Sequence, residues 1–222
     1  MSLRVLTWNL FHGRAVPPRD EDLFDAFAEC LAGWRWDVAL LQEVPPWWPV
    51  ALACACDADV RFALTSRNAL LPLRRTAASR RPELLKANGG GCNALLVRGL
   101  GGIRAQARRR MCVWPERRVL HAVQVADGRW FANAHASTHP PRARRELALA
   151  RACVLAWAGD APLVFGGDLN LRDPRLPGFA HVGRSDVDHV FTRGLAHAHA
   201  HAETPARAGL SDHAPLLVTF DG

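Results

Sequence analysis

The chain has 222 residues, a formal net charge of +7 and 49% hydrophobic residues. This composition excludes a mainly disordered chain, because its apolar surface can offset the entropy that folding removes. No run approaches the roughly 18 apolar residues of a membrane helix, and no secretory signal precedes the first predicted strand. We therefore expect one cytoplasmic domain over residues 1–222, monomeric and without stable membrane insertion.

The first third of the chain alternates between strand and helix patterns. Residues 20–34 carry apolar side chains three and four positions apart, the spacing of a helix. A short apolar run at 37–41 is typical of a buried strand. In chain order we predict a strand at 4–9, a helix at 20–34, a strand at 37–41, a helix at 47–55 and a strand at 60–64.

Residues 67–91 differ in character, because they are rich in arginine, contain two prolines and end in three glycines. We predict a long surface loop, a kind of segment that is usually functional or mobile. Beyond it we predict strands at 93–98, 119–125 and 130–136, a helix at 142–157, and strands at 163–166, 187–192, 195–202 and 215–220. This mixture favours an α/β fold with two packed sheets covered by helices.

Polar side chains stand at or near the ends of the predicted apolar strands. Strand ends on one side of a sheet converge in space, which is where α/β proteins bind ligands. We expect such a convergence of asparagine, glutamate, aspartate and histidine at Asn9, Glu43, Asn133, His135, Asp168, Asn170, Asp188, Asp212 and His213.

This set of side chains has a definite chemistry. Oxygen-rich ligands suit a hard cation such as Mg²⁺ or Mn²⁺. A histidine paired with an aspartate can deprotonate water or stabilise charge on a phosphate. Because no serine or cysteine occupies a nucleophile-elbow sequence, we predict direct attack of an activated water on phosphorus.

Six short motifs follow one another along the chain, and together they carry a family resemblance. They are Thr7-Trp8-Asn9, Leu41-Gln42-Glu43, Asn133-Ala134-His135, Gly167-Asp168-Leu169-Asn170, Asp186-Val187-Asp188-His189-Val190 and Ser211-Asp212-His213-Ala214-Pro215. With them, the chain resembles the endonuclease/exonuclease/phosphatase superfamily of deoxyribonucleases, abasic-site endonucleases, sphingomyelinases and inositol polyphosphate phosphatases. The resemblance implies a four-layer α/β sandwich, in which two packed mixed β-sheets are flanked by helices.

The resemblance also implies a metal site. Glu43 would be the principal ligand of Mg²⁺ or Mn²⁺, Asn9 would help to bind metal or phosphate, and Asp212 would complete the site. The enzyme would then be a metal-dependent phosphoric ester hydrolase.

The remaining motif residues receive roles in the reaction by the same resemblance. Asp168 and Asn170 would orient the attacking water. His213 would contact the scissile phosphate as a base or as an electrostatic stabiliser, and Asp188 would hydrogen-bond it and fix its tautomer. His135 would bind phosphate or protonate the leaving group.

The charge of the chain is concentrated in one segment. Residues 61–118 hold 14 basic residues against two acidic ones, a formal charge of +12, whereas 1–60 carry −5 and 119–222 carry zero. Arginine makes bidentate contacts with phosphate, so we predict that this segment binds a polyanion, with nucleic acid as the leading substrate. The predicted substrate-binding residues are Asn133, Arg108, Arg109 and Arg110.

Two alternative functions remain open from the sequence. The same chemistry could act on a phospholipid, a sphingolipid or an inositol or sugar phosphate. The 67–91 segment contains leucines but no aromatic residue, so it supports a membrane surface only in part. The second alternative is a non-catalytic nucleic-acid-binding protein, which would require the loss of site residues.

Two histidine features stand outside the motifs. His12 lies just beyond the first strand and is a candidate for the rim of the site. His197, His199 and His201 alternate with alanines, and we interpret them as the outward face of an outer strand.

Overall fold

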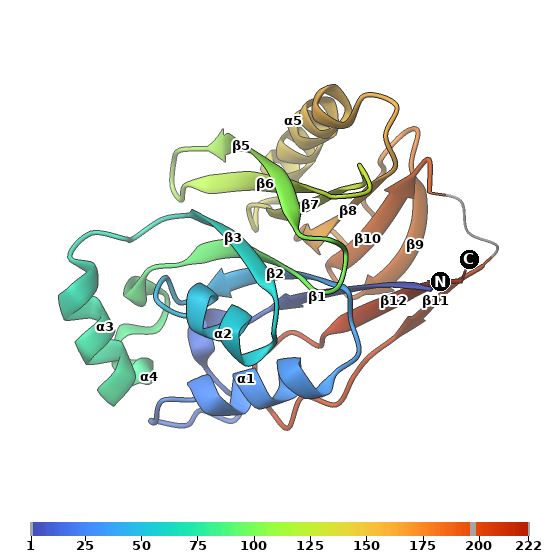
Figure 1. The fold of residues 1–222 in the computed structure, drawn as a ribbon. Coiled ribbons are helices and arrows are strands. Elements are labelled where there is room, and N and C mark those ends of the chain that lie inside the picture. Colours follow the sequence, from blue (N-terminus) through green and yellow to red (C-terminus); the bar gives the residue numbers. More distant parts are fainter. Residues whose placement is uncertain (1, 196–198, 222) are drawn as a thin grey trace.

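Two six-stranded sheets pack face to face in the computed structural model, which describes residues 2–195 and 199–221 (Figure 1). The first sheet contains, in spatial order, β11 (His199–Glu203), β12 (Leu216–Asp221), β1 (Leu3–Asn9), β2 (Val38–Val44), β4 (Cys92–Val97) and β3 (Asp59–Leu64). The second contains β5 (Ile103–Cys112), β6 (Arg118–Val125), β7 (Trp130–His135), β8 (Leu163–Asp168), β10 (Asp188–Arg193) and β9 (Ala180–Ser185).

Each sheet has one parallel pair among its central strands. β1 runs parallel to β2, and β7 runs parallel to β8, whereas the other paired strands are antiparallel. The prediction of two packed mixed sheets is therefore confirmed. Because parallel strands end on the same side, β1 and β2 deliver their last residues to one edge of the sandwich, and β7 and β8 do the same from the other sheet.

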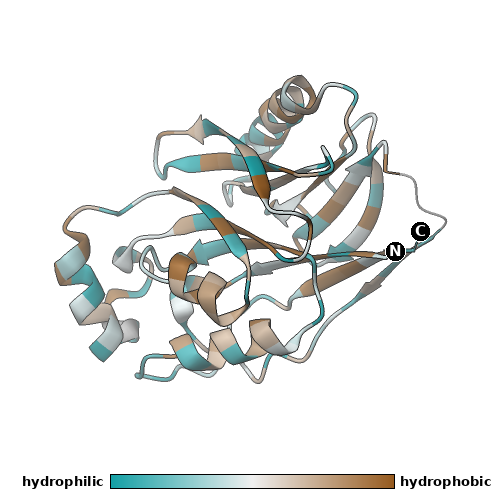
Figure 2. Ribbon diagram, viewed as in Figure 1, coloured by the Kyte–Doolittle hydropathy of each residue, from teal (hydrophilic) through white to brown (hydrophobic). Residues whose placement is uncertain are grey.

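Helices cover the two outer faces and complete the four layers. Helices α1 (Phe24–Gly33) and α2 (Pro49–Ala55) lie against the first sheet, and α5 (Pro140–Ala158) lies against the second (Figure 1). Figure 2 shows hydrophobic residues along the strands of both sheets and on α1 and α2. In the part of the chain that the structure describes, no helix is long and apolar enough to cross a membrane.

The layer between the sheets is built mainly from β-branched side chains and leucines, which pack well on pleated surfaces. It contains Val5, Val38, Leu40, Leu95, Val97, Val123, Val125, Phe131, Val164, Val190 and Val218, all nearly inaccessible to solvent. This close-packed layer fixes the two sheets, and therefore the two sets of strand ends, relative to each other.

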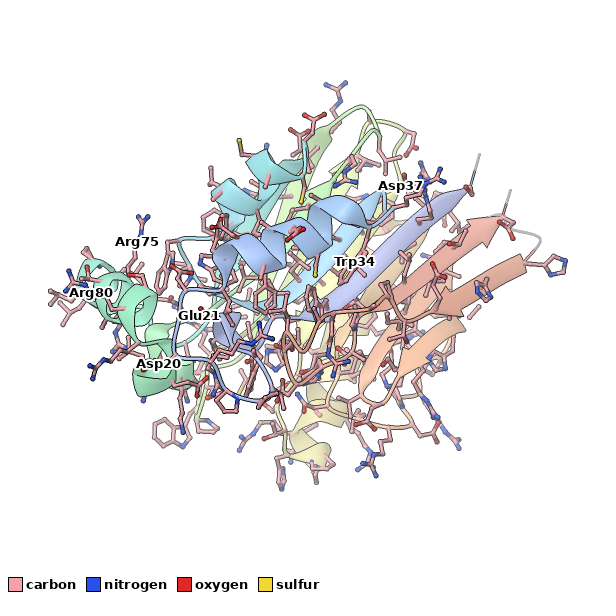
Figure 3. The ribbon with its side chains drawn as sticks, turned by 90° about the horizontal axis from the view of Figure 1, so that it is seen from below. Asp20, Glu21, Trp34, Asp37, Arg75 and Arg80 are labelled. Carbon is pink, nitrogen blue, oxygen red and sulfur yellow. The ribbon has the colours of Figure 1, made fainter. Side chains whose placement is uncertain are left out.

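The structure differs from the sequence prediction in several segments. Instead of a loop, residues 67–91 form α3 (Leu71–Arg80), α4 (Pro82–Leu85) and a 3₁₀ turn at Lys86–Gly89. α3 was missed because it buries none of its residues and so has no apolar stripe. Figure 3 shows its Arg75 and Arg80 projecting away from the sandwich.

Strands β5 and β9 were also absent from the sequence prediction. Both lie at the edge of a sheet and have exposed residues at many positions, so they lack a continuous apolar pattern. His199 and His201 lie on β11 and are exposed, but Ala200 and Ala202 between and after them are exposed as well, so the alternation does not divide a buried face from an exposed one. His197 lies outside the described residues. The assignment of the whole chain to one domain stays a prediction.

Candidate metal and phosphate site

The two parallel strand pairs open into one hollow of about 490 Å³ at the edge of the sandwich. Most of the sequence-predicted site residues meet there. The hollow is lined by Asn9, Glu43, His135, Asp168, Asn170, Asp212 and His213, together with Phe11, Arg67, Pro115, Glu116, Arg118, Ser137, Thr138 and Arg142. Asp188 lies beside it, bonded to His213.

Strand register explains why residues so far apart in sequence converge. In the parallel β7–β8 pair His135 is the partner of Asp168, and in the antiparallel β8–β10 pair Asp168 is the partner of Asp188. On the other sheet, Asn9 ends β1 opposite Gln42 of β2. The sheets are packed so that Asn9 Nδ2 donates to Asp168 Oδ2 at 3.0 Å, which joins the two sets of strand ends.

Glu43 reaches the hollow because β2 is irregular at its end. The pairing of β2 with β4 shifts between Leu41 and Val44, and Glu43 itself has a φ of 49°. A bulge of this kind redirects a side chain that a regular strand would turn elsewhere. Glu43 Oε2 lies 3.0 Å from His12 Nε2. Burial opposes ionisation of Glu43, but this hydrogen bond and the His12 charge hold the pKa of its carboxyl well below the usual range.

His135 stands between the two sheets' carboxylates. Its Nε2 lies 3.3 Å from Asp168 Oδ2 and 3.8 Å from Glu43 Oε1. Burial and the nearby Arg118 charge lower the pKa of His135 well below its usual value. The ring is therefore neutral at pH 7 and offers one N–H donor.

His213 is held on a loop that is tied to β1. Trp8 Nε1 donates to the His213 carbonyl at 3.0 Å, and the His213 amide donates to Ser211 Oγ, whose hydroxyl in turn donates to the Asn9 carbonyl. The His213 ring is thereby placed with Nδ1 2.7 Å from Asp188 Oδ2.

Nε2 of the same ring lies 3.7 Å from Asp168 Oδ2. Burial disfavours a charged His213, but its hydrogen bond to Asp188 and the surrounding carboxylates raise its pKa to about 9. At neutral pH the ring is an imidazolium that directs its second N–H toward the hollow.

Asp168 is the most enclosed carboxylate of the site, with 1% of its surface exposed. Burial and the neighbouring Asp188 charge raise its pKa. Its Oδ1 accepts the Asn170 backbone N–H at 3.1 Å, and the Asn170 side chain donates to the Ala136 carbonyl at 3.0 Å. Asn170 has a φ of 50°, a conformation that asparagine tolerates better than most residues, and it holds its side chain at the wall of the hollow.

The donor set fits a hard divalent cation. Glu43 and Asp168 both face His135 Nε2, and Asp212 lines the same wall. Asn9 lines it too, but its Oδ1 already accepts the Phe11 backbone N–H at 2.9 Å, so a cation would use the second lone pair of that oxygen. Ligand atoms of Asp168, Asp188 and His213 also lie within 4.8 Å of one another. Because Asp188 and His213 are already joined by a short hydrogen bond, we interpret this second cluster as a positioning pair rather than as the metal ligands.

Four predicted substrate-binding residues are not brought to the hollow. Asn133 is fully buried between the sheets, where it accepts from Gln42 Nε2 and donates to the Leu41 and Ala94 carbonyls. Its amide atoms are bonded to these interior partners and do not line the hollow, so the substrate-binding role of Asn133 stays a prediction that this geometry does not support. Arg108 and Arg110 line a different hollow, and Arg109 lines neither.

Other lining residues were not predicted individually, although Arg67 and Arg118 lie in the 61–118 segment that was predicted to bind a polyanion. Arg67, Arg118 and Arg142 contribute three guanidinium groups to the hollow. A signal for Arg142 was present, because it lies in the first turn of the helix that follows the His135 strand. The contact between His12 and Glu43 was not predicted, although His12 was a candidate for the rim.

The comparisons with known proteins agree with this geometry. A sequence model of the Endonuclease/Exonuclease/phosphatase family matches residues 6–213. A search of curated proteins found no match. Among solved structures, TDP2 from Caenorhabditis elegans is similar with a TM-score of 0.73 and 16% identity, covering 100% of this chain and 75% of that one.

Two bacterial structures are similar as well. An endonuclease/exonuclease/phosphatase from Beutenbergia cavernae has a TM-score of 0.74 and 20% identity, covering 100% of this chain and 72% of its own. The mannosyl-6-phosphatase Bt3783 of Bacteroides thetaiotaomicron has a TM-score of 0.65 and 13% identity, covering 97% and 98%. At these identities the likeness shows the fold.

Proposed function

We infer the reaction from one premise: this chain belongs to the endonuclease/exonuclease/phosphatase family and is a phosphoric ester hydrolase. We propose that it is a Mg²⁺- or Mn²⁺-dependent phosphodiesterase that hydrolyses nucleic acid by direct attack of water on phosphorus. We further propose that it acts as a cytoplasmic monomer. The observation that carries the reaction is the buried Asp168, bonded to Asn9 and set between His135 and His213.

Glu43, Asn9 and Asp212 would hold the cation, which when bound supplies a positive charge against the phosphate oxygens. Asp168 accepts a proton from the attacking water, and its raised pKa makes it a better base than an exposed carboxylate. Asn170 orients that water, because its side chain is fixed by the Ala136 carbonyl.

The histidines act on the phosphate. The His213 imidazolium donates its Nε2–H to a non-bridging oxygen, where it stabilises the negative charge that develops as water adds. Asp188 keeps that ring charged and oriented through Nδ1. His135 is neutral, and its N–H binds a phosphate oxygen or the departing oxygen.

Nucleic acid is favoured as substrate by the cations around the hollow. Arg67, Arg118 and Arg142 line it together with Glu116, which pairs with the first two and offsets one of the three positive charges. They belong to a chain whose positive charge is concentrated at residues 61–118. Guanidinium groups bind phosphates on both sides of a scissile bond, whereas a monoester offers one phosphate only.

A phospholipid or sphingolipid is the second candidate substrate, and one observation favours it. Leu70 and Leu73, at the start of α3, are 70% and 69% exposed beside the exposed Arg75. Leucines next to arginines suit an anionic membrane surface. Hydrolysis of short-chain lipid in vesicles but not of oligonucleotides would select this candidate.

The experiment that tests the proposed function uses the purified protein with a labelled oligonucleotide and with bis(p-nitrophenyl) phosphate, a small diester. We expect hydrolysis with Mg²⁺ or Mn²⁺ and none in EDTA. Asp168→Ala and His213→Ala should lose at least about 100-fold in kcat. Asp25→Ala, which removes an exposed carboxylate of α1, is the matched control and should retain full activity. Hydrolysis in EDTA, or full activity in both site variants, would overturn the mechanism.

A further inference from the structure

A second hollow, distinct from the catalytic one, lies where the open edges of the two sheets meet. β3 and β5 are the edge strands on this side, and each is paired with a single neighbour in its sheet. Between them is a hollow of about 630 Å³ lined by Phe62, Leu64 and Ala63 of β3, Arg108 and Arg110 of β5, and Arg117 and Val119 at the start of β6. We call it the edge groove.

The edge groove is strongly basic. Its lining includes three arginines and no acidic residue. Among the described residues, no carboxylate pairs with Arg108 or Arg110, and Arg117 is bonded to the Thr65 carbonyl and through its amide to Ser66. The positive charge of the groove is therefore not neutralised by the protein itself.

A buried histidine lies beside the arginines of the groove. His121 is the cross-strand partner of Arg108 and is 1% exposed, and neither of its ring nitrogens has a hydrogen-bond partner among the described residues. Burial, with the charges of Arg108 and Arg61, lowers the pKa of His121 to about 4. The ring is therefore neutral at pH 7, first because it is buried, and the two arginine charges act in the same direction.

The groove also offers apolar faces. Phe62 and Leu64 are each 38% exposed and line the same hollow as the arginines. Arginines on an edge strand can serve simply to prevent sheets from pairing edge to edge. That purpose gives no role to an exposed aromatic ring, whereas binding of unpaired bases does, because bases stack on aromatic side chains.

The groove adjoins the catalytic hollow along two segments of chain. Arg117 lines the groove and Arg118 lines the catalytic hollow. Leu64 lines the groove and Arg67, three residues later, lines the catalytic hollow. Arg67 and Arg118 both pair with Glu116, so the wall between the two hollows is held in place.

We propose that the edge groove binds a single strand of nucleic acid that extends from the catalytic hollow, with phosphates on Arg108, Arg110 and Arg117 and a base against Phe62. This inference rests on the proposed function, because it assumes that the cleaved substrate is a nucleic acid. It adds a binding site for the uncleaved part of the strand, away from the metal.

The test measures binding without cleavage. A fluorescent 20-nucleotide single strand is titrated with the 222-residue chain in EDTA, and fluorescence anisotropy gives Kd at several salt concentrations. The salt slope is the slope of log Kd against log salt concentration. Two lost phosphate contacts should lower this slope by about 1.4, which corresponds to a Kd about 25-fold higher at 0.1 M salt. We therefore expect this loss for R108Q/R110Q and not for the control R35Q/R129Q, whose charges lie near the opposite strand ends.

Further arms separate this proposal from its alternatives. R108K/R110K keeps the charge and should restore the salt slope. F62A should weaken single-strand binding and leave duplex binding unchanged. With Mg²⁺, all groove variants should hydrolyse bis(p-nitrophenyl) phosphate at the wild-type rate, which also shows that they are folded.

Some results would overturn the proposal. An unchanged Kd and salt slope in R108Q/R110Q would remove the groove as a binding site, and self-association of that variant with unchanged Kd would assign the arginines to edge protection. An equal effect of F62A on duplex and single strand would overturn the single-strand assignment. If the wild type binds the strand through these arginines but does not hydrolyse it, the proposed function is refuted and the groove remains a nucleic-acid-binding site.

Discussion

Replacing Asp188 by asparagine tests how the site controls the charge of its histidine. Asp188 Oδ2 lies 2.7 Å from His213 Nδ1, and the pKa of His213 is raised from 6.5 to about 9. This difference corresponds to about 3 kcal/mol in favour of the imidazolium. In Asp188→Asn, the amide oxygen can still accept the Nδ1–H, but the charge is lost.

We expect the pKa of His213 in this variant to fall by about 2.5 units, to near its ordinary value of 6.5. At pH 7.5 the protonated fraction would then drop from nearly complete to about one tenth. If the imidazolium stabilises the phosphate, kcat falls about tenfold at pH 7.5 and much less at pH 5.5. The alkaline limb of the rate profile should move down by the same amount, about 2.5 pH units.

The pKa of His213 is measured in EDTA by NMR of the histidine ring nitrogens. The dependence of the rate on pH is measured with Mg²⁺ and bis(p-nitrophenyl) phosphate. Asp186→Asn is the control, because it removes a carboxylate two residues away that is exposed and paired with Arg172. An unchanged His213 pKa in Asp188→Asn, or an equal loss of rate at every pH, would refute this reasoning.

Three further predictions concern the metal, the pH dependence of stability and the buried amide. Glu43→Gln should lower Mn²⁺ affinity by at least about 100-fold in calorimetric titrations, since it removes the principal charged ligand. Unchanged affinity would exclude Glu43 as a ligand. Without metal, the stabilisation from protonated His213 is complete below about pH 6.5 and disappears as the pH rises through about 9. The melting temperature in EDTA should therefore fall between about pH 6.5 and pH 9. A rise over this interval would contradict the raised pKa of His213. Asn133→Ala should reduce the free energy of unfolding in urea by about 2–4 kcal/mol, because it leaves the Gln42 donor and the Leu41 carbonyl without this partner. Lost activity at unchanged stability would return Asn133 to substrate binding.

The site residues were predictable because their positions follow from local rules. Asn9 and His135 end buried strands, Glu43 lies at the end of another, and Asp168 ends the strand beside that of His135. A buried strand has a recognisable apolar run, and its polar end is visible in the sequence. Parallel pairing then brings such ends together, so the pattern predicts convergence without knowledge of side-chain geometry.

The rest could not be predicted because it depends on contacts between elements. Asn133 and His135 are two residues apart on one strand, yet Asn133 lies between the sheets and His135 lines the hollow. Only the packing of the first sheet against this strand distinguishes them. Likewise, the alternating sides of β5 direct Arg108 and Arg110 into the edge groove and leave Arg109 outside it, which depends on the unpredicted edge strand.

The catalytic hollow is assembled half from each sheet. Asn9 and Glu43 come from the first, and His135 and Asp168 from the second, and a hydrogen bond from Asn9 to Asp168 crosses between them. In the proposed reaction, residues of the first sheet hold the cation and Asp168 of the second sheet receives the proton, so the rate of hydrolysis would depend on the spacing of the two layers. Substitutions deep in the Val and Leu layer, far from any reacting atom, would then appear first as a lower kcat and only later as unfolding.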